Sequence, residues 1–201
     1  MTLSKLAAPE LILASTSPYR RELLHRLRLP FRVIAPGVDE TPGPTETPAP
    51  LAERLALAKA RAVAREQPQA VVIGSDQVAD LDGQCLGKPL THERARQQLH
   101  QMRGRCVIFQ TAVAVVSQAR GFEQLRRAEV RVQFADLSDA QIEHYLLAEQ
   151  PYDCAGSARS EALGIALLRS IDSDDPTALI GLPLIRTCEL LRAAGIDPLL
   201  P

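Results

Sequence analysis

Residues 15–21, with the sequence Ser-Thr-Ser-Pro-Tyr-Arg-Arg, combine the side chains and spacing of an anion-binding site. Ser17 suits a helix N-cap and Pro18 suits the first helical position, where its missing N–H costs nothing. Free backbone N–H groups, the helix dipole and the guanidinium groups of Arg20 and Arg21 would all favour phosphate there. Cations in a first turn are unfavourable unless an anion offsets them. A capped helix with a solvated basic turn is the alternative interpretation.

Two predicted strands bring polar residues to the same edge of a sheet. The apolar residues 11–14 precede the basic turn, and the apolar residues 70–73 precede Gly74-Ser75-Asp76-Gln77. In α/β sheets ligands bind beyond the carboxyl ends of strands, so parallel strands would place both segments in one crevice. Asp76 would there deprotonate a water molecule, hold a divalent cation, or do both. An aspartate that merely ends a strand is the other interpretation.

Four more charged residues are candidates for the same chemistry. Asp39 and Glu40 lie on a proline-rich loop over residues 36–50 and offer carboxylates to a metal, although for Asp39 a solvated loop residue is the better interpretation. Lys59 interrupts the apolar face of a helix predicted over 51–66, and Lys88 lies in a Gly-Lys-Pro turn. Either lysine would neutralise charge on a phosphoryl group, but exposed lysines are common.

The remaining pattern predicts how these residues are positioned. A capping box, Ser138 to Gln141, starts a helix that ends near Glu149, and Asp82-Gly83 turns a hairpin over 78–86. Strands are expected over 31–34, 105–116 and 125–134, helices over 91–102 and 183–194, a turn over 154–157, and a short apolar run over 165–168. Alternating strands and helices followed by long strands predict an α/β fold with a mixed sheet.

Composition limits the classes of function. The chain has 201 residues and a formal net charge of −1, which predicts a single domain over 1–201 and no binding of nucleic acid polymers or anionic membranes. It has no apolar run near the ~20 residues of a membrane span, and residues 1–5 resemble no leader. The four histidines have no ligand pattern, and the four cysteines, without paired spacing, are expected to be buried in a cytoplasmic protein.

The ordered set of short motifs resembles the Maf family of nucleotide pyrophosphatases. The set covers nearly the whole chain and consists of Ala14-Ser15-Thr16-Ser17-Pro18 with Arg20-Arg21, Val38-Asp39-Glu40, Lys59-Ala60, Gly74-Ser75-Asp76, Gly87-Lys88-Pro89 and Gly181-Leu182-Pro183. The resemblance implies an elongated Maf/ITPase-like α/β fold, with a mixed β-sheet flanked by helices and a cleft between two lobes. It also implies hydrolysis of nucleoside triphosphates to monophosphate and pyrophosphate with a divalent cation, Mg²⁺, Mn²⁺ or Co²⁺.

Site residues follow from the same resemblance. Asp76 matches the family's proton acceptor, and the positions that line its triphosphate site are matched by Ser15, Arg20, Glu40, Lys59 and Lys88. Glu40 and Asp76 are then the candidate metal ligands. Whether Asp76 acts as base, metal ligand or both stays open, as does the metal used in the cell, and the family makes a homodimer plausible.

Three residues depart from the pattern of many members. Tyr19 replaces an arginine, Gln77 replaces a threonine, and Glu161 accompanies them, as in the branch that prefers 7-methyl-GTP over dTTP and UTP. A 7-methylguanine ring is cationic, so it suits an aromatic face and a carboxylate that accepts hydrogen bonds from its N1–H and amine. An ordinary exposed tyrosine at a helix start is the alternative for Tyr19. A broader house-cleaning pyrophosphatase and a nucleotide-binding regulator of cell division are the alternative functions.

Overall fold

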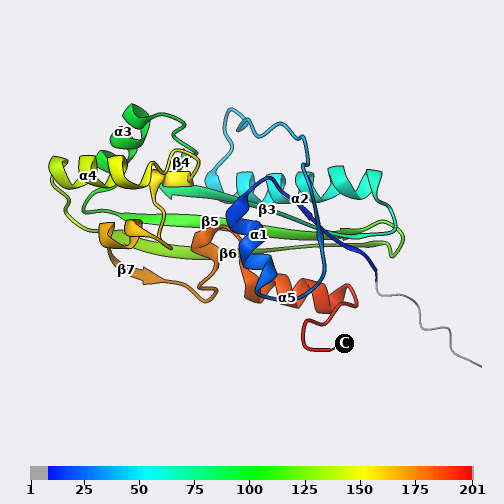
Figure 1. Cartoon of the computed structure of the whole chain (residues 1–201). Coiled ribbons are helices and arrows are strands. Elements are labelled where there is room, and N and C mark those ends of the chain that lie inside the picture. Colours follow the sequence, from blue (N-terminus) through cyan, green and yellow to red (C-terminus); the bar gives the residue numbers. More distant parts are fainter. Residues whose placement is uncertain (1–8, 201) are drawn as a thin grey trace, which may run out of the picture.

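A seven-stranded mixed β-sheet runs the length of the molecule and is flanked by helices (Figure 1). The computed structural model describes residues 9–200. The strands are β1 (Leu11–Ala14), β2 (Arg32–Ile34), β3 (Val71–Leu81), β4 (Gln84–Leu86), β5 (Cys106–Ser117), β6 (Phe122–Phe134) and β7 (Leu168–Asp172). The helices are α1 (Pro18–His25), α2 (Pro48–Glu66), α3 (His92–Met102), α4 (Asp139–Glu149) and α5 (Leu184–Ala193), with 3₁₀ turns η1 (Ala155–Ser157), η2 (Leu163–Leu167) and η3 (Ala178–Ile180).

The strand order confirms the predicted mixed sheet. The main path is β2-β1-β3-β5-β6-β7, and β4 pairs with β3. β1 is parallel to β2 and β3, whereas the β3–β4, β3–β5, β5–β6 and β6–β7 pairs are antiparallel. The predicted hairpin turn is also present, with Asp82 and Gly83 both at positive φ, as a tight two-residue turn requires.

β3 is longer than the sequence predicted, and this corrects the expected position of Asp76. The strand does not end at Ile73 but continues to Leu81, so residues 74–77 lie within it. The reason is pairing across the sheet, because β5 opposes β3 without a break from Val72 to Asp80. Polar side chains in the middle of a strand are tolerated where one edge of that strand faces a cavity rather than another strand.

Three apolar clusters hold the helices on the sheet. α2 packs on one face, where Ile12, Val72, Ala112 and Ala114 alternate with residues that face the other way. α1 and α5 cover the opposite set, which includes Leu13, Ile73, Val113 and Val115. α3 and α4 pack on the far half of the sheet against Ala79, Leu81, Val107 and Phe109.

These packings divide the sheet into two lobes. α1, α2 and α5 gather on one half, and α3 and α4 on the other, as Figure 1 shows. Within residues 9–200, no helix has both the length and the apolar character needed to cross a membrane. Residues 1–5, expected to lead into the first strand, lie outside the described residues. The expected burial of the cysteines is wrong, because Cys106 is exposed and the other three are partly exposed.

Candidate active site

A cavity of about 700 Å³ opens where one edge of β3 lacks a neighbouring strand. On that edge β1 pairs with β3 only as far as Gly74, and β4 pairs with it only from Ala79 onward. The intervening residues Asp76, Gln77 and Val78 line the cavity instead. The prediction that the basic turn and Asp76 share one crevice is therefore confirmed, although Asp76 reaches it from within a strand.

The basic turn forms one wall, and local hydrogen bonds explain its shape. Ser17 caps α1 by accepting a hydrogen bond from the backbone N–H of Arg20 at 3.4 Å, and Pro18 starts the helix as predicted. The hydroxyl oxygen of Ser15 accepts from the N–H of Ser17 at 3.1 Å. Ser15 is 3% exposed and lies behind the wall, whereas Thr16, Ser17 and Arg20 line the cavity.

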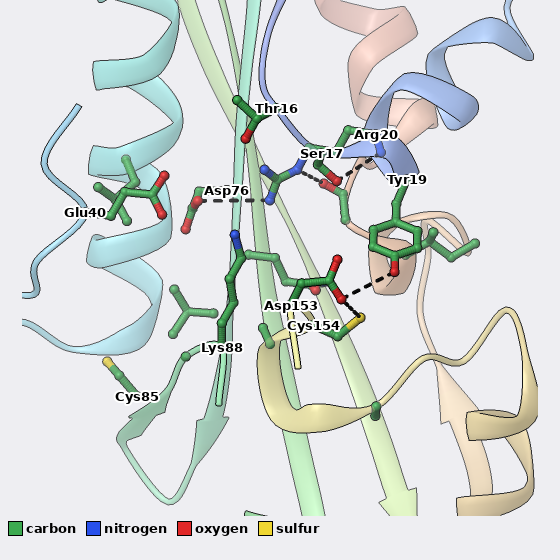
Figure 2. A pocket seen from close by; sticks show the side chains of 18 of the residues that line it. Thr16, Ser17, Tyr19, Arg20, Glu40, Asp76, Cys85, Lys88, Asp153 and Cys154 are labelled. Atoms are coloured by element: carbon green, nitrogen blue, oxygen red, sulfur yellow. Dashed lines mark hydrogen bonds and ion pairs between the residues drawn. The ribbon is translucent and has the colours of Figure 1, made fainter. Parts of the chain in front are cut away.

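Arg20 and Arg21 separate as their positions on the helix predict. The Nε of Arg20 donates to the carbonyl oxygen of Gly181 at 2.8 Å, and its Nη2 lies 4.0 Å from Oδ1 of Asp76. Arg21 is exposed to solvent. The bond to Gly181 fixes the guanidinium plane, so its remaining N–H groups are directed along the cavity toward Asp76 (Figure 2).

Lys59 connects the two candidate metal ligands. Its Nζ lies 2.6 Å from Oδ1 of Asp76 and 2.7 Å from Oε1 of Glu40. Lys59 and Asp76 are 4% and 7% exposed, whereas the Glu40 side chain is half exposed on its loop. Burial acts to raise the pKa of Glu40, but the hydrogen bond from Lys59 and the charges of Lys59, Lys88 and Arg20 outweigh it and lower that pKa. Glu40 is therefore a carboxylate at neutral pH.

A glycine allows this contact between helix and strand. Gly74 faces α2 so closely that a Cβ there would lie 2.3 Å from the carbonyl oxygen of Ala56 and 2.5 Å from the backbone nitrogen of Ala60. α2 consequently lies against β3, and Lys59, the residue before Ala60, reaches Asp76 from within the apolar interface. The sequence showed Lys59 as a break in an apolar face, and its partner across the interface explains that break.

Lys88 lines the cavity near Asp76 and comes from the other lobe. It is exposed, follows β4, and extends its ammonium group toward Asp76 in Figure 2. Its turn is joined to the segment over 151–157, since the Leu90 N–H donates to the Tyr152 carbonyl at 3.0 Å and the Gly156 N–H donates to the Gly87 carbonyl at 3.4 Å. Lys88 therefore lies in a turn that is hydrogen-bonded to the segment at the opposite end of the cavity.

The opposite end is aromatic and acidic. The Tyr19 hydroxyl donates to Oδ1 of Asp153 at 3.4 Å, and Cys154 lies beside both (Figure 2). Burial first, and then Cys154 and Asp153, raise the pKa of Tyr19, so its phenol remains neutral. Glu161 also lines this end, with a side chain that is one quarter exposed. The cavity therefore has cations at one end and carboxylates around an aromatic ring at the other.

Gln77 forms a fixed part of the wall between these ends. Its amide nitrogen donates to the carbonyl oxygens of Ala178 at 2.8 Å and Leu179 at 3.0 Å, and lies 3.1 Å from Oγ1 of Thr111. The bonds to these two neighbouring carbonyls leave its side chain little freedom. Gln77 therefore forms a fixed part of the cavity wall.

Glu40 and Asp76 offer the donor set for a divalent cation. Among residues 9–200 no group of three or more His, Cys, Asp or Glu side chains is arranged to hold a metal ion. Two carboxylates fit Mg²⁺ or a similar hard cation, which takes one or two carboxylates and completes its shell with water and substrate phosphate oxygens. The ammonium of Lys59 already contacts Oδ1 of Asp76 and Oε1 of Glu40, so a cation would be held by the other oxygen of each carboxylate. Asp39 does not join them, because it is exposed and accepts a hydrogen bond from Thr41 N–H in its own loop.

A family model described as Maf-like protein matches residues 10–194. The chain belongs to the Maf family. Relatives named 7-methyl-GTP pyrophosphatase include a Polaromonas protein that is 73% identical over 92% of this chain and 85% of its own length. Another, from Albidiferax ferrireducens, is 68% identical over 94% of this chain and 96% of its own. A third, from Methylobacillus flagellatus, is 57% identical over 94% and 98%.

The solved structures that resemble this chain include a more distant protein. The Ham1 protein of Staphylococcus aureus is 18% identical, with a TM-score of 0.46, over 63% of this chain and 72% of its own.

This Maf-like chain brings most of the predicted site residues to one cavity. The predicted residues that line the cavity are Tyr19, Arg20, Glu40, Asp76, Gln77, Lys88 and Glu161. Lys59 lies directly behind Asp76, and the role of Ser15 as a phosphate contact stays a prediction. Sequence reasoning missed Asp153 and Cys154, which only the tertiary fold brings to Tyr19. It also missed Arg159, whose guanidinium carbon lies 5.2 Å from the centre of the Tyr19 ring.

Proposed function

We propose that this Maf-family chain hydrolyses 7-methyl-GTP to 7-methyl-GMP and pyrophosphate. The observation that supports it is the opposite charge of the two ends of one cavity. Arg20, Lys59 and Lys88 supply cations around Asp76, while Glu161 and Asp153 surround the ring of Tyr19. A 7-methylguanosine triphosphate has the complementary charges, with an anionic triphosphate and a cationic base. The names of the high-identity relatives support the same substrate.

At the phosphate end, Asp76 takes the proton of the attacking water. The water oxygen forms a bond to the α-phosphorus, the bond from that phosphorus to the bridging oxygen breaks, and pyrophosphate leaves with the bridging oxygen. Asp76 lines the cavity while Lys59 holds its Oδ1, so the carboxylate is oriented before the water arrives. Arg20 and Lys88 bind the phosphate oxygens on either side and stabilise the charge that develops on the leaving group.

We further propose that Asp76 and Glu40 would hold a divalent cation together with the substrate. When bound, it would supply charge neutralisation at the phosphoryl oxygens. The lowered pKa of Glu40 supports this, since a ligand must be deprotonated at neutral pH. The identity of the cation, a cytoplasmic location and a homodimeric state remain predictions from the sequence and the family.

At the base end, Tyr19 stacks on the methylated ring and Glu161 accepts hydrogen bonds from the N1–H and the amine of that ring. A desolvated cation–π contact contributes up to about 2 kcal/mol, which is roughly thirtyfold in selectivity. Loss of a carboxylate that pairs with buried donors costs about as much. Tyr19→Ala and Glu161→Ala should therefore lower kcat/KM for 7-methyl-GTP far more than for UTP. Tyr19→Arg should be worse still, because like charges repel.

The decisive experiment measures pyrophosphate release from 7-methyl-GTP, GTP, UTP and dTTP, with Mg²⁺, Mn²⁺, Co²⁺ or EDTA in parallel. We expect 7-methyl-GTP to be the best substrate, 7-methyl-GMP to be the nucleoside product, and EDTA to abolish turnover. Faster hydrolysis of UTP or dTTP would overturn the proposal that the base is 7-methylguanine, but it would still agree with a pyrophosphatase activity. Release of orthophosphate with 7-methyl-GDP would overturn the cleavage site. Tight binding without turnover would favour a nucleotide-binding regulator.

A further inference from the structure

One side chain outside the cavity contacts both residues assigned to the base. The guanidinium carbon of Arg159 lies 5.2 Å from the centre of the Tyr19 ring, and its Nε lies 3.4 Å from Oε1 of Glu161. Its Nη1 lies 3.6 Å from Oε2 of Glu149 on α4. Tyr19 and Glu161 line the cavity, whereas Arg159 is not among the lining residues, so it meets both of them from behind.

The backbone of Arg159 is held in place independently. Its N–H donates to the hydroxyl of Tyr145 at 3.0 Å, and that hydroxyl donates in turn to the Ser157 carbonyl at 3.2 Å. Tyr145 is 3% exposed. Gly164 lies so close that a Cβ there would be 2.4 Å from the Arg159 carbonyl oxygen. A rigid backbone therefore carries this arginine to the two cavity residues.

The guanidinium is held by charge and ring contacts rather than by a well-formed hydrogen bond at Nε. Within residues 9–200, the Arg159 Nε is buried and has no hydrogen-bond partner. Apart from Arg159, the Tyr19 side chain has a 3.4 Å hydrogen bond to the exposed Asp153 and a contact with the Cys154 thiol, both at its hydroxyl, so neither holds the face of the ring. Without Arg159, both the phenol ring and the Glu161 carboxylate would regain rotamer freedom.

We propose that Arg159 is a positioning residue for base recognition, which orders Tyr19 and Glu161 before the nucleotide binds. The proposal rests on the proposed function. Ordering a side chain in advance removes an immobilisation cost that corresponds to roughly two- to tenfold in affinity for each side chain. Arg159 orders two of them, so its loss should weaken binding of the methylated base by about tenfold.

The charge of Arg159 by itself would act in the opposite direction. A cation near Tyr19 and Glu161 repels a cationic base and partly neutralises the carboxylate that reads it. If this repulsion outweighed positioning, removing the charge would improve the KM for 7-methyl-GTP. The two effects thus predict KM changes of opposite sign.

The test compares Arg159→Gln and Arg159→Lys with the wild type, using 7-methyl-GTP and GTP as substrates. Arg169→Gln is the matched control, because Arg169 is exposed on β7. For Arg159→Gln we expect the KM for 7-methyl-GTP to rise by about tenfold, with kcat within about twofold of wild type. The KM for GTP, which lacks the cationic ring, should rise less. Arg159→Lys keeps the charge without the planar guanidinium and should restore part of the loss.

An unchanged ratio of the two KM values in folded Arg159→Gln, or a lower KM for 7-methyl-GTP, would overturn the proposal. So would a fall in kcat alone. If Arg159→Gln fails to fold, Glu149→Gln loosens the same guanidinium from the other side and should shift the KM ratio in the same direction. A wild-type enzyme that does not prefer 7-methyl-GTP would refute the proposed function, whereas a wild-type preference that survives in the variants refutes only the role of Arg159.

Discussion

Gly74→Ala should disturb the catalytic geometry from a position that touches no substrate. The new Cβ would lie 2.3 Å from the Ala56 carbonyl oxygen, 2.5 Å from the Ala60 nitrogen and 2.9 Å from the Ala60 Cβ. Two of these three are backbone atoms of α2, which cannot rotate away. Ordinary contact begins at 3.4 Å, so α2 must retreat by about 1 Å. Lys59 moves with the helix and away from Asp76.

Both consequences have an expected size. Overpacking of a close-packed interface destabilises by about 1–3 kcal/mol, and a clash with backbone belongs at the upper end. A displacement of about 1 Å in a catalytic group costs on the order of 10²-fold in rate. Gly74→Ala should therefore lower both the free energy of unfolding and the kcat of the molecules that remain folded.

Urea unfolding and pyrophosphate release, each measured at a temperature where the variant is fully folded, separate the two effects. Gly43→Ala is the control, because its nearest neighbour, the Glu46 Cβ, would lie at an ordinary 3.5 Å. We expect Gly43→Ala to match the wild type in both assays. The reasoning would be falsified if Gly74→Ala unfolded within about 0.5 kcal/mol of wild type and kept its kcat.

Three further outcomes follow from the site. Asp76→Asn keeps shape but loses the base, so kcat for pyrophosphate release should fall by ~10²–10⁴-fold, and near wild-type turnover in a folded variant would refute the mechanism. Arg20→Lys loses the fixed guanidinium and should lower kcat/KM more than Arg21→Ala, because Arg21 is exposed; the reverse ranking would contradict the phosphate contact. Burial, and then Asp153, raise the pKa of the Cys154 thiol to about 12. Below pH 9.0, the ordinary pKa of a thiol, Cys154 is neutral in both the folded and the unfolded chain, and its contribution to the free energy of unfolding is complete. That contribution is lost as the pH rises from 9.0 toward 12, because only the unfolded chain then loses the proton readily. Iodoacetamide at pH 8 should therefore label the exposed Cys106 well before Cys154 in a peptide map, and equal labelling would contradict the assigned environment.

Local signals in the sequence predicted the basic turn correctly, and non-local contacts explain what the sequence missed. The cap at Ser17, the proline after it and the leucines of α1 lie within one short segment, so their pattern is complete in itself. The length of β3 was not predictable in this way, because the strand that continues its pairing past Gly74 is β5, whose residues follow only after β4 and α3 in the chain. Polar residues over 74–77 therefore looked like a strand end.

The cluster of Lys59, Glu40 and Asp76 shows the same limit. Lys59, Glu40 and Asp76 were each weak candidates alone, and only the packing of α2 on β3 and the course of the loop before α2 bring them within hydrogen-bond distance. Arg159 carried no signal at all, since an arginine in a polar segment has no pattern of its own. Its partner Tyr19 comes from the other end of the chain.

The two ends of the cavity differ in how freely evolution can alter them. Lys59 and Asp76 form a buried pair between helix and strand, and loss of one partner from such a pair destabilises by about 3–5 kcal/mol. Tyr19 and Glu161 lie on the first turn of α1 and on a connecting segment near the surface, where substitutions change stability little. Under the proposed function, the residues that recognise the base can therefore be substituted at a smaller cost in stability than those around Asp76. The same argument applies to protein design: substitutions that alter base preference are best made at Tyr19 and Glu161, where they change stability little.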